Sequence, residues 1–217
     1  MNKNYLIITT ILLLFSLLTF VISTFIIYPN KWKNYLIEFI QSIESNDNNK
    51  INKILLEISN SGKREEYNFF YGLLKFYNGE EEEGTKILTS ISNSNLNEEE
   101  KAIMNFLVGE YLLFNKDVSG IPLLLSKECY NIFSNYVNYT IGIYNFDKGN
   151  YEEALEFLYS ATNIENQEIK KEVLLRITFI YLLKEGKIES NIISEIEKLE
   201  SNKNFISNII NQFKIFY

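Results

Sequence analysis

The segment Asn135–Asn163 places small residues where two short helices would have to meet. Apolar residues recur at three- and four-residue spacing on both sides of Gly149, which predicts two amphipathic helices joined by a tight turn. Gly142 lies seven residues before Gly149, and Ala154 lies five residues after it. Small residues at both places let the helices approach closely. A single hairpin cannot bury its apolar face alone, so we expect several to stack on one another.

The same arrangement recurs along the chain at a nearly constant period. Gly72 and Gly84 stand at the same offsets of seven and five residues from Gly79, and Gly109 stands seven residues before Lys116. The four expected turns are separated by 37, 33 and 37 residues, at Gly79, Lys116, Gly149 and Gly186. Repetition of one unit at this spacing predicts a helical-repeat architecture.

This pattern of small residues and turns resembles the tetratricopeptide (TPR) repeat, a helical hairpin of about 34 residues. Residues 135–163 carry the resemblance most fully, and a helical repeat of another family is the alternative. The resemblance implies an all-α protein in which residues 31–201 form a right-handed α-solenoid of about five TPR-like hairpins. The hairpins are expected over residues 31–62, Arg64–Ser92, Glu98–Phe133, Asn135–Asn163 and Gln167–Leu199.

A long uncharged stretch precedes the hairpins. Tyr5–Tyr28 contains 24 residues without a charge, and as a helix it would extend about 36 Å, enough to cross a hydrocarbon core of about 30 Å. We therefore expect residues 1–30 to form an N-terminal tail and an uncleaved transmembrane anchor. The alternative is a signal peptide cleaved after Ser23, whose apolar region would be unusually long. The short tail before the anchor favours a soluble domain on the extracytoplasmic side.

The residues after the last hairpin predict one more helix, 202–217. Phe205, Ile209 and Phe213 form an apolar stripe at four-residue spacing. Solenoids need a terminal cap because their last repeat otherwise exposes an apolar face. We expect a plain cap on the last hairpin, since the link from Leu199 is short. The alternative is a helix that folds back and occupies the groove described below.

Composition argues against several classes of function. The formal net charge is −7, and phosphate contacts need clustered Lys and Arg, so no nucleic-acid partner is expected. Lys170, Lys171 and Arg176 are interspersed with glutamates and are interpreted as a solvated helix face. The chain has no histidine and a single cysteine, Cys129, which argues against zinc sites, catalytic triads and internal disulfides. We expect no enzymatic activity, no cofactor and no metal.

Two acidic runs could be mistaken for paired catalytic carboxylates. Glu80–Glu83 and Glu98–Glu100 each lie where a helix is expected to begin. Negative side chains are favourable there because the helix dipole is positive at its N-terminus. We therefore expect both runs to stabilise helix starts.

The TPR resemblance also implies a candidate binding surface. In that family the first helices of the hairpins line the concave face, and the matching positions here are apolar and aromatic rather than basic. This chemistry suits an apolar or aromatic peptide or helix of another protein, and the alternative is that these side chains are core. The candidate groove residues are Phe69, Leu73, Phe76, Tyr77, Phe106, Leu113, Phe114, Tyr136, Tyr139, Ile143 and Phe146.

Together these features predict a membrane-anchored TPR-like scaffold or adaptor that mediates protein–protein interactions in a cell-envelope assembly. The alternative of a different class is a membrane-tethered, chaperone-like holder of apolar segments of exported proteins. A scaffold should co-purify with a few defined partners, whereas a holder should bind many unfolded clients weakly. An enzyme is the most distant alternative.

Overall fold

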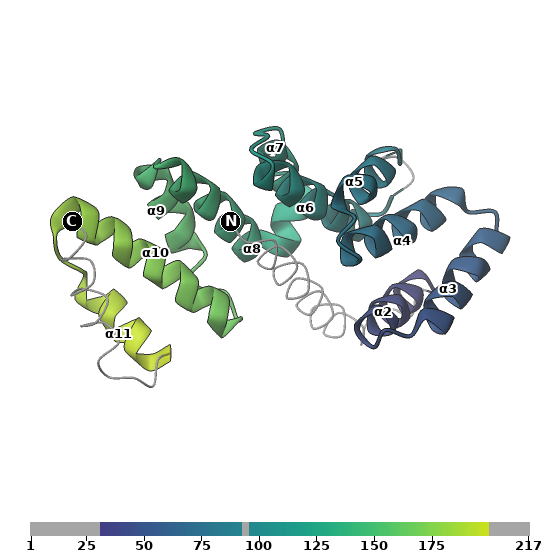
Figure 1. The fold of residues 1–217 in the computed structure, drawn as a ribbon, viewed down its shortest axis with the longest axis horizontal. Helices are drawn as coiled ribbons and strands as arrows, with labels where there is room; N and C mark the ends of the chain where they lie inside the picture. The colour runs from purple at the N-terminus through teal and green to yellow at the C-terminus, as the bar shows by residue number, and fades with distance from the viewer. Residues whose placement is uncertain (1–30, 93–95, 200–217) are drawn as a thin grey trace. The chain divides into compact units, whose positions relative to one another are not determined.

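The structure, a computed structural model, describes residues 31–92 and 96–199 of the 217-residue chain. Over these residues every regular element is an α-helix and no strand is present (Figure 1), which confirms the all-α class. No helix within the described ranges is long and apolar enough to cross a membrane. The anchor expected at Tyr5–Tyr28 and the helix expected at 202–217 lie outside the described residues.

Except in the segment after Lys116, the helices come in the order expected from the sequence. The chain is divided into two compact units, one up to Tyr111 and the other from Leu112 onward, and the division falls inside one helix, α6. The helices are α2 (Lys31–Glu44), α3 (Asn48–Asn60), α4 (Arg64–Tyr77), α5 (Glu81–Thr89), α6 (Glu98–Phe114), α7 (Gly120–Leu124), α8 (Lys127–Lys148), α9 (Tyr151–Ser160), α10 (Gln167–Glu185) and α11 (Ser190–Leu199).

The four expected turn residues all adopt the left-handed backbone conformation. Their φ angles are +75° at Gly79, +65° at Lys116, +78° at Gly149 and +67° at Gly186. At Gly149 the turn closes with two backbone hydrogen bonds: the N–H of Gly149 donates to the carbonyl of Phe146, and the N–H of Asn150 donates to that of Asn145. This pairing satisfies carbonyls that the end of a helix leaves unpaired. The sequence prediction of these turns is confirmed.

Unit 1 packs its hairpins around aromatic rings. Phe39 of α2 meets Phe70 of α4 edge-on, with ring centroids 5.0 Å apart, and both side chains are fully buried. Gly72 and Gly84 lie where α4 and α5 cross: a Cβ atom on Gly84 would lie 2.6 Å from the ring of Phe76 and 3.1 Å from the Gly72 carbonyl oxygen. Only glycine leaves room for this approach, because real Cβ contacts are longer.

Unit 2 is built around the hairpin of α8 and α9. A Cβ atom on Gly142 would lie 2.9 Å from the side chain of Leu158 and 3.2 Å from its backbone nitrogen. Ala154, on the facing helix, is fully buried. Helix α10 packs against α9, and Val173 and Ile177 of α10 belong to the same apolar core. The expected close contact of α8 with α9 at small residues is confirmed.

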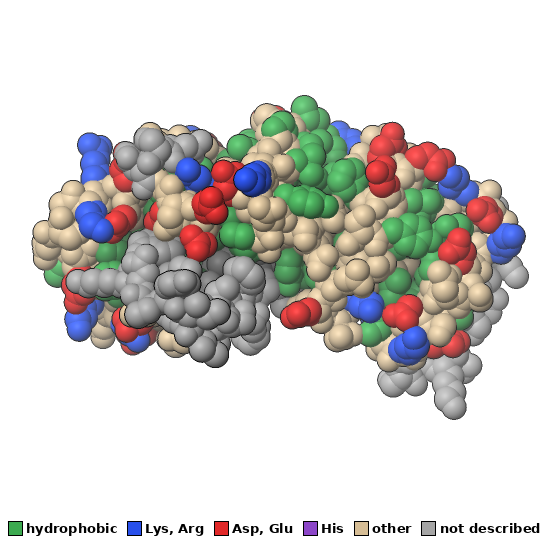
Figure 2. All heavy atoms as spheres, turned by 180° about the vertical axis from the view of Figure 1, so that it is seen from behind, with side chains coloured by type: hydrophobic (Ala, Val, Ile, Leu, Met, Phe, Trp, Pro, Cys, Tyr) green, Lys and Arg blue, Asp and Glu red, His purple; other side chains and the backbone are tan. Residues whose placement is uncertain are grey.

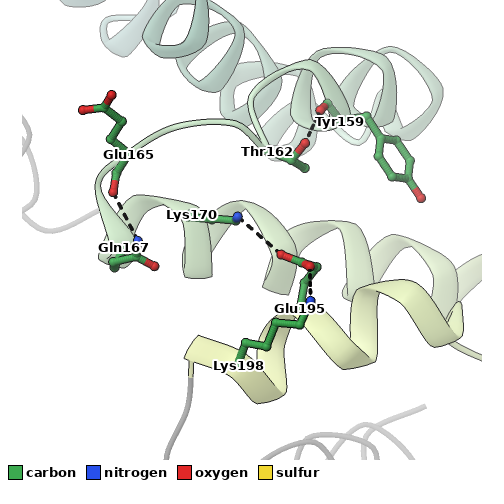
Figure 3. Close-up of polar contacts among 7 residues, drawn as sticks. All are labelled: Tyr159, Thr162, Glu165, Gln167, Lys170, Glu195 and Lys198. Carbon is green, nitrogen blue, oxygen red and sulfur yellow. Dashed lines mark hydrogen bonds and ion pairs between the residues drawn. The ribbon is translucent and has the colours of Figure 1, made fainter.

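Helix α11 is held against α10 by charges as well as by its apolar face. The carboxylate of Glu195 pairs with Lys170 of α10 at 3.4 Å and with Lys198 of its own helix at 2.8 Å (Figure 3). Ile192 and Ile196 of α11 are buried in the core of unit 2. Exposed ion pairs contribute little stability, so burial of the isoleucines is the main force that holds α11 in place.

The segment after Lys116 differs from the expected hairpin. Instead of one second helix there are two pieces, the short α7 and the first turns of α8. Pro122 lies in the first turn of α7, where a missing N–H costs nothing. Helix α8 is interrupted at Phe133, whose φ and ψ are −117° and 22°. The boundary expected between Phe133 and Asn135 therefore falls at a kink within α8 rather than at a loop.

Candidate partner-binding face

The eleven candidate groove residues divide into two groups by burial. The first group is at most 7% exposed and consists of Phe69, Leu73, Phe76, Phe106, Leu113 and Tyr139. The second group is half-buried and consists of Tyr77, Phe114, Tyr136, Ile143 and Phe146. Side chains of the first group cannot offer a surface to a partner without rearrangement, since they are already covered by the protein itself. These six side chains are therefore part of the core, as the alternative interpretation stated.

Two members of the buried group, Phe76 and Phe69, show which contacts cover it. Phe76 is 5% exposed and lies directly over Gly84. Its ring also meets the ring of Tyr111 edge-on, with centroids 6.4 Å apart. Phe69 packs edge-on against Phe70, with centroids 5.8 Å apart. Both side chains, which the TPR resemblance placed in the groove, are therefore packed against other residues of this protein.

The half-buried residues of α8 form the best candidate surface. Tyr136, Ile143 and Phe146 pack by part of their side chains on the core of unit 2 and remain partly open. The ring of Phe146 meets that of Tyr151 at 5.9 Å and that of Phe179 at 5.6 Å, both at steep angles. Edge-on aromatic pairs of this kind favour a fixed ring orientation. We call Tyr136, Ile143, Phe146, Glu172, Arg176 and Phe179 the α8–α10 face.

Helix α10 contributes to this face an ion pair that includes Arg176, a residue expected from the sequence to lie on a solvated helix face. The guanidinium of Arg176 pairs with Glu172 at 2.7 Å and lies 5.3 Å from the ring centroid of Phe146. The carboxylate of Glu172 also accepts a hydrogen bond from the Tyr139 hydroxyl at 2.7 Å. Arg176 is therefore half-buried against an aromatic ring, and its interpretation as part of a solvated face was wrong. The i, i+4 spacing of Glu172 and Arg176 on a first helix was the available signal.

The acidic runs lie at helix starts, as expected. Glu100 and Asn97 form a reciprocal capping pair at the start of α6, with hydrogen bonds of 2.8 and 2.9 Å between the side chain of each and the backbone N–H of the other. Glu81–Glu83 occupy the first turn of α5. Within residues 31–92 and 96–199, no three His, Cys, Asp or Glu side chains are placed to hold a metal ion.

The single cysteine lies in an unreactive environment. Cys129 is buried in α8, and burial raises the pKa of its thiol to about 12. The thiol is therefore protonated at neutral pH, and a protonated thiol is a poor nucleophile. This agrees with its interpretation as a small buried apolar side chain.

Glu110 of α6 has the most perturbed carboxyl among the described glutamates whose values are resolved. Burial raises its pKa from 4.5 to about 7, because a low-dielectric environment disfavours the charged form. The folded state thus holds the proton more tightly than the unfolded state does. Its contribution to stability is fully present below pH 4.5 and is lost as the pH rises through 7.

Replacing Glu110 with glutamine should therefore remove a pH-dependent loss of stability. We expect Glu110→Gln to raise the free energy of unfolding at pH 8 by roughly 2 kcal/mol, since one pKa unit corresponds to about 1.4 kcal/mol and the half-buried side chain retains some solvent. At pH 4 the variant and the parent should be equally stable. Urea unfolding at both pH values measures this, with Glu197→Gln, at an exposed position of α11, as the matched control. Equal gains at both pH values would contradict the prediction.

Comparison of the chain with protein families, with curated proteins and with solved structures finds no match.

Proposed function

We propose that this protein is a membrane-anchored, TPR-like scaffold or adaptor that binds other proteins in a cell-envelope assembly. The observation that carries the proposal is the side-by-side packing of the first helices of consecutive hairpins. In a solenoid this packing creates a continuous row of first helices, and such a row is the surface that repeat proteins use for binding.

The packing is present in each unit considered by itself. In unit 1, α2 and α4 are the first helices of neighbouring hairpins and meet through the rings of Phe39 and Phe70. In unit 2, α8 and α10 meet through the Phe146 and Phe179 rings and through the Tyr139–Glu172 hydrogen bond. The second helix α9 contacts both α8 and α10. This arrangement is consistent with a stack of helical hairpins, of which a TPR-like stack is one kind.

The chemistry of the α8–α10 face suggests the kind of partner. Partly open aromatic and aliphatic side chains provide apolar area, and the Arg176–Glu172 pair provides one fixed charge of each sign. Aromatic residues and arginine are the side chains most often found at the centres of protein interfaces. The face therefore suits an apolar or aromatic peptide, or the apolar side of a helix.

Photo-crosslinking from the α8–α10 face tests the proposal. A photoreactive amino acid is introduced at Tyr136 in the full-length protein, and the same amino acid at Glu153, on the exposed side of α9, serves as the control. In intact cells we expect a few discrete adducts from position 136 and none of them from position 153. A diffuse ladder of many products would favour the chaperone-like holder, and an absence of adducts specific to position 136 would contradict both.

The proposed anchor makes a separate prediction about the mature chain. If Tyr5–Tyr28 is retained as a single membrane span, the mature protein begins at Met1 or Asn2 and stays in the membrane fraction after carbonate extraction. The reason is its run of 24 uncharged residues, which is longer than a signal-peptide core. Intact-mass spectrometry of the purified protein measures the start. A mature chain that begins at Thr24 would contradict the anchor.

We further propose that the helical part lies on the extracytoplasmic side. A chain with a single cysteine has no internal disulfide that could report an oxidising compartment. The side of the membrane is therefore best determined from the accessibility of the helical units to protease. Protease added to intact cells should cleave the helical units only if they lie outside the cytoplasm.

A further inference from the structure

Exposed apolar side chains are concentrated around the short helix α7. In the described part of the chain, the large hydrophobic side chains that are clearly exposed are Val118 (60%), Leu125 (43%), Tyr130 (38%) and Leu56 (61%). Three of these four lie within thirteen residues that include α7, whereas Leu56 stands alone on α3. Single exposed hydrophobic residues are ordinary, but a group of them marks a contact site.

The local structure explains why these side chains point outward. Helix α7 has five residues and packs on α8 with Gly120 and Leu124, both of which are buried. The residues that flank it, Val118 and Leu125, then face away from the core. Pro122 is exposed on α7 itself. We call residues 116–127 the α7 tip.

The α7 tip has exposed positive charges at both ends. Lys116 and Lys127 are exposed and bracket the apolar residues, while the whole chain carries a net charge of −7. The one acidic residue of the tip, Asp117, accepts a hydrogen bond from the backbone N–H of Ser119 at 2.9 Å. The tip is thus an apolar surface with lysines at its edges within a largely acidic protein.

The size of the tip favours a lipid surface over a protein partner. Figure 2 shows hydrophobic side chains gathered on the surface around α7. A stable protein interface needs about 20–30 residues from each side, and the tip has about a dozen. Aliphatic side chains that reach into the acyl boundary, with lysines among anionic headgroups, need no such area.

We propose that the α7 tip is a second membrane contact, in which Val118 and Leu125 enter the interfacial region of an anionic bilayer. Lys116 and Lys127 would then lie at the level of the lipid phosphates, because long basic side chains place their stems on apolar surface and their charges in the polar layer. The inference rests in part on the proposed anchor, which would hold the tip near a bilayer.

Quenching by lipid-borne bromine tests the contact. The chain has one tryptophan, so Trp32→Phe supplies a silent background for Val118→Trp, for Leu125→Trp and for the control Leu56→Trp. The full-length proteins are reconstituted into phosphatidylcholine–phosphatidylglycerol vesicles with brominated acyl chains, and flotation first establishes that they are bound. We expect about twofold quenching of tryptophan at 118 and 125 and almost none at 56. Reversing both tip lysines in the 118 variant (Lys116→Glu, Lys127→Glu) should remove most of that quenching.

The outcomes separate the tip from the anchor. Chains that float but show equal, weak quenching at 118, 125 and 56 would overturn the tip contact and leave the anchor standing. Chains that do not float would overturn both, because the proposed tip contact depends on the anchor to hold the tip at a bilayer. Quenching that survives the double lysine reversal would overturn the proposed contact with headgroups. Leu56, Lys116, Val118, Leu125 and Lys127 are all exposed, so substitutions at these five sites should leave the helix content measured by circular dichroism unchanged.

Discussion

Replacing Gly142 with leucine is expected to destabilise unit 2 by about 2 kcal/mol. Two effects of opposite sign combine: removing a glycine from a helix interior gains up to about 1 kcal/mol, whereas overpacking a tight contact typically costs 1–3 kcal/mol. The cost lies at the upper end here, because a Cβ atom on Gly142 would meet the Leu158 backbone nitrogen at 3.2 Å as well as its side chain. A side chain can rotate away, but the backbone of a packed helix cannot.

Thermal melting of the full-length protein in detergent measures this effect. A loss of about 2 kcal/mol should lower the melting temperature by roughly 10 °C for a unit of this size. Ala154→Leu should act in the same direction, since Ala154 is fully buried on the facing helix. Glu156→Leu adds the same side chain to the exposed side of α9 and should change little. If the Gly142 variant melts like the Glu156 variant, the two helices do not meet at these residues.

The largest loss is expected for Phe70→Ala in unit 1, about 4 kcal/mol. Deleting a buried phenylalanine ring typically costs 3–5 kcal/mol, through lost burial and through the cavity left behind. Phe70 is fully buried and its ring meets both Phe39 at 5.0 Å and Phe69 at 5.8 Å. The variant therefore loses two edge-on ring contacts together with the apolar area.

Urea unfolding followed by hydrogen exchange assigns this loss to its unit. In the Phe70 variant, backbone amides should lose protection from hydrogen exchange first in residues 31–111. In the Gly142 variant, they should lose it first in residues 112–199, because each substituted residue lies within one unit. Leu56→Ala, a truncation of a side chain that is 61% exposed, should stay within about 0.5 kcal/mol of the parent. A Phe70 variant as stable as the Leu56 variant would show that the α2–α4 ring contact is not part of the core.

The sequence alone predicted the features that depend on local chemistry, namely the turns, the helix positions and the helix starts. The turns at Gly79, Gly149 and Gly186 were predictable because glycine adopts positive φ without steric cost. Even Lys116 was located by the repeat period, although a lysine carries no preference for that conformation. Helix positions followed from apolar spacing, and the capping role of Glu100 followed from its place in the first turn of α6.

The α7–α8 segment shows where local signals were insufficient. Pro122 correctly indicated that a helix begins near it, but nothing in the spacing predicted that this helix would have five residues. Nor did the spacing predict that α8 would run on through a kink at Phe133. Helix length there depends on which apolar residues find a neighbour to pack against, and that depends on the tertiary arrangement.

The candidate face was decided by tertiary structure. Phe76 and Phe146 each stand three residues before the glycine of their turn and so occupy matching positions of their repeats, yet Phe76 is 5% exposed and Phe146 is half-buried. Periodicity states that a side chain lies on the apolar side of its helix, but its exposure depends on how closely the next helix approaches. The same holds for Arg176. Its charge predicted an exposed side chain, but in the structure α8 places the ring of Phe146 beside its guanidinium.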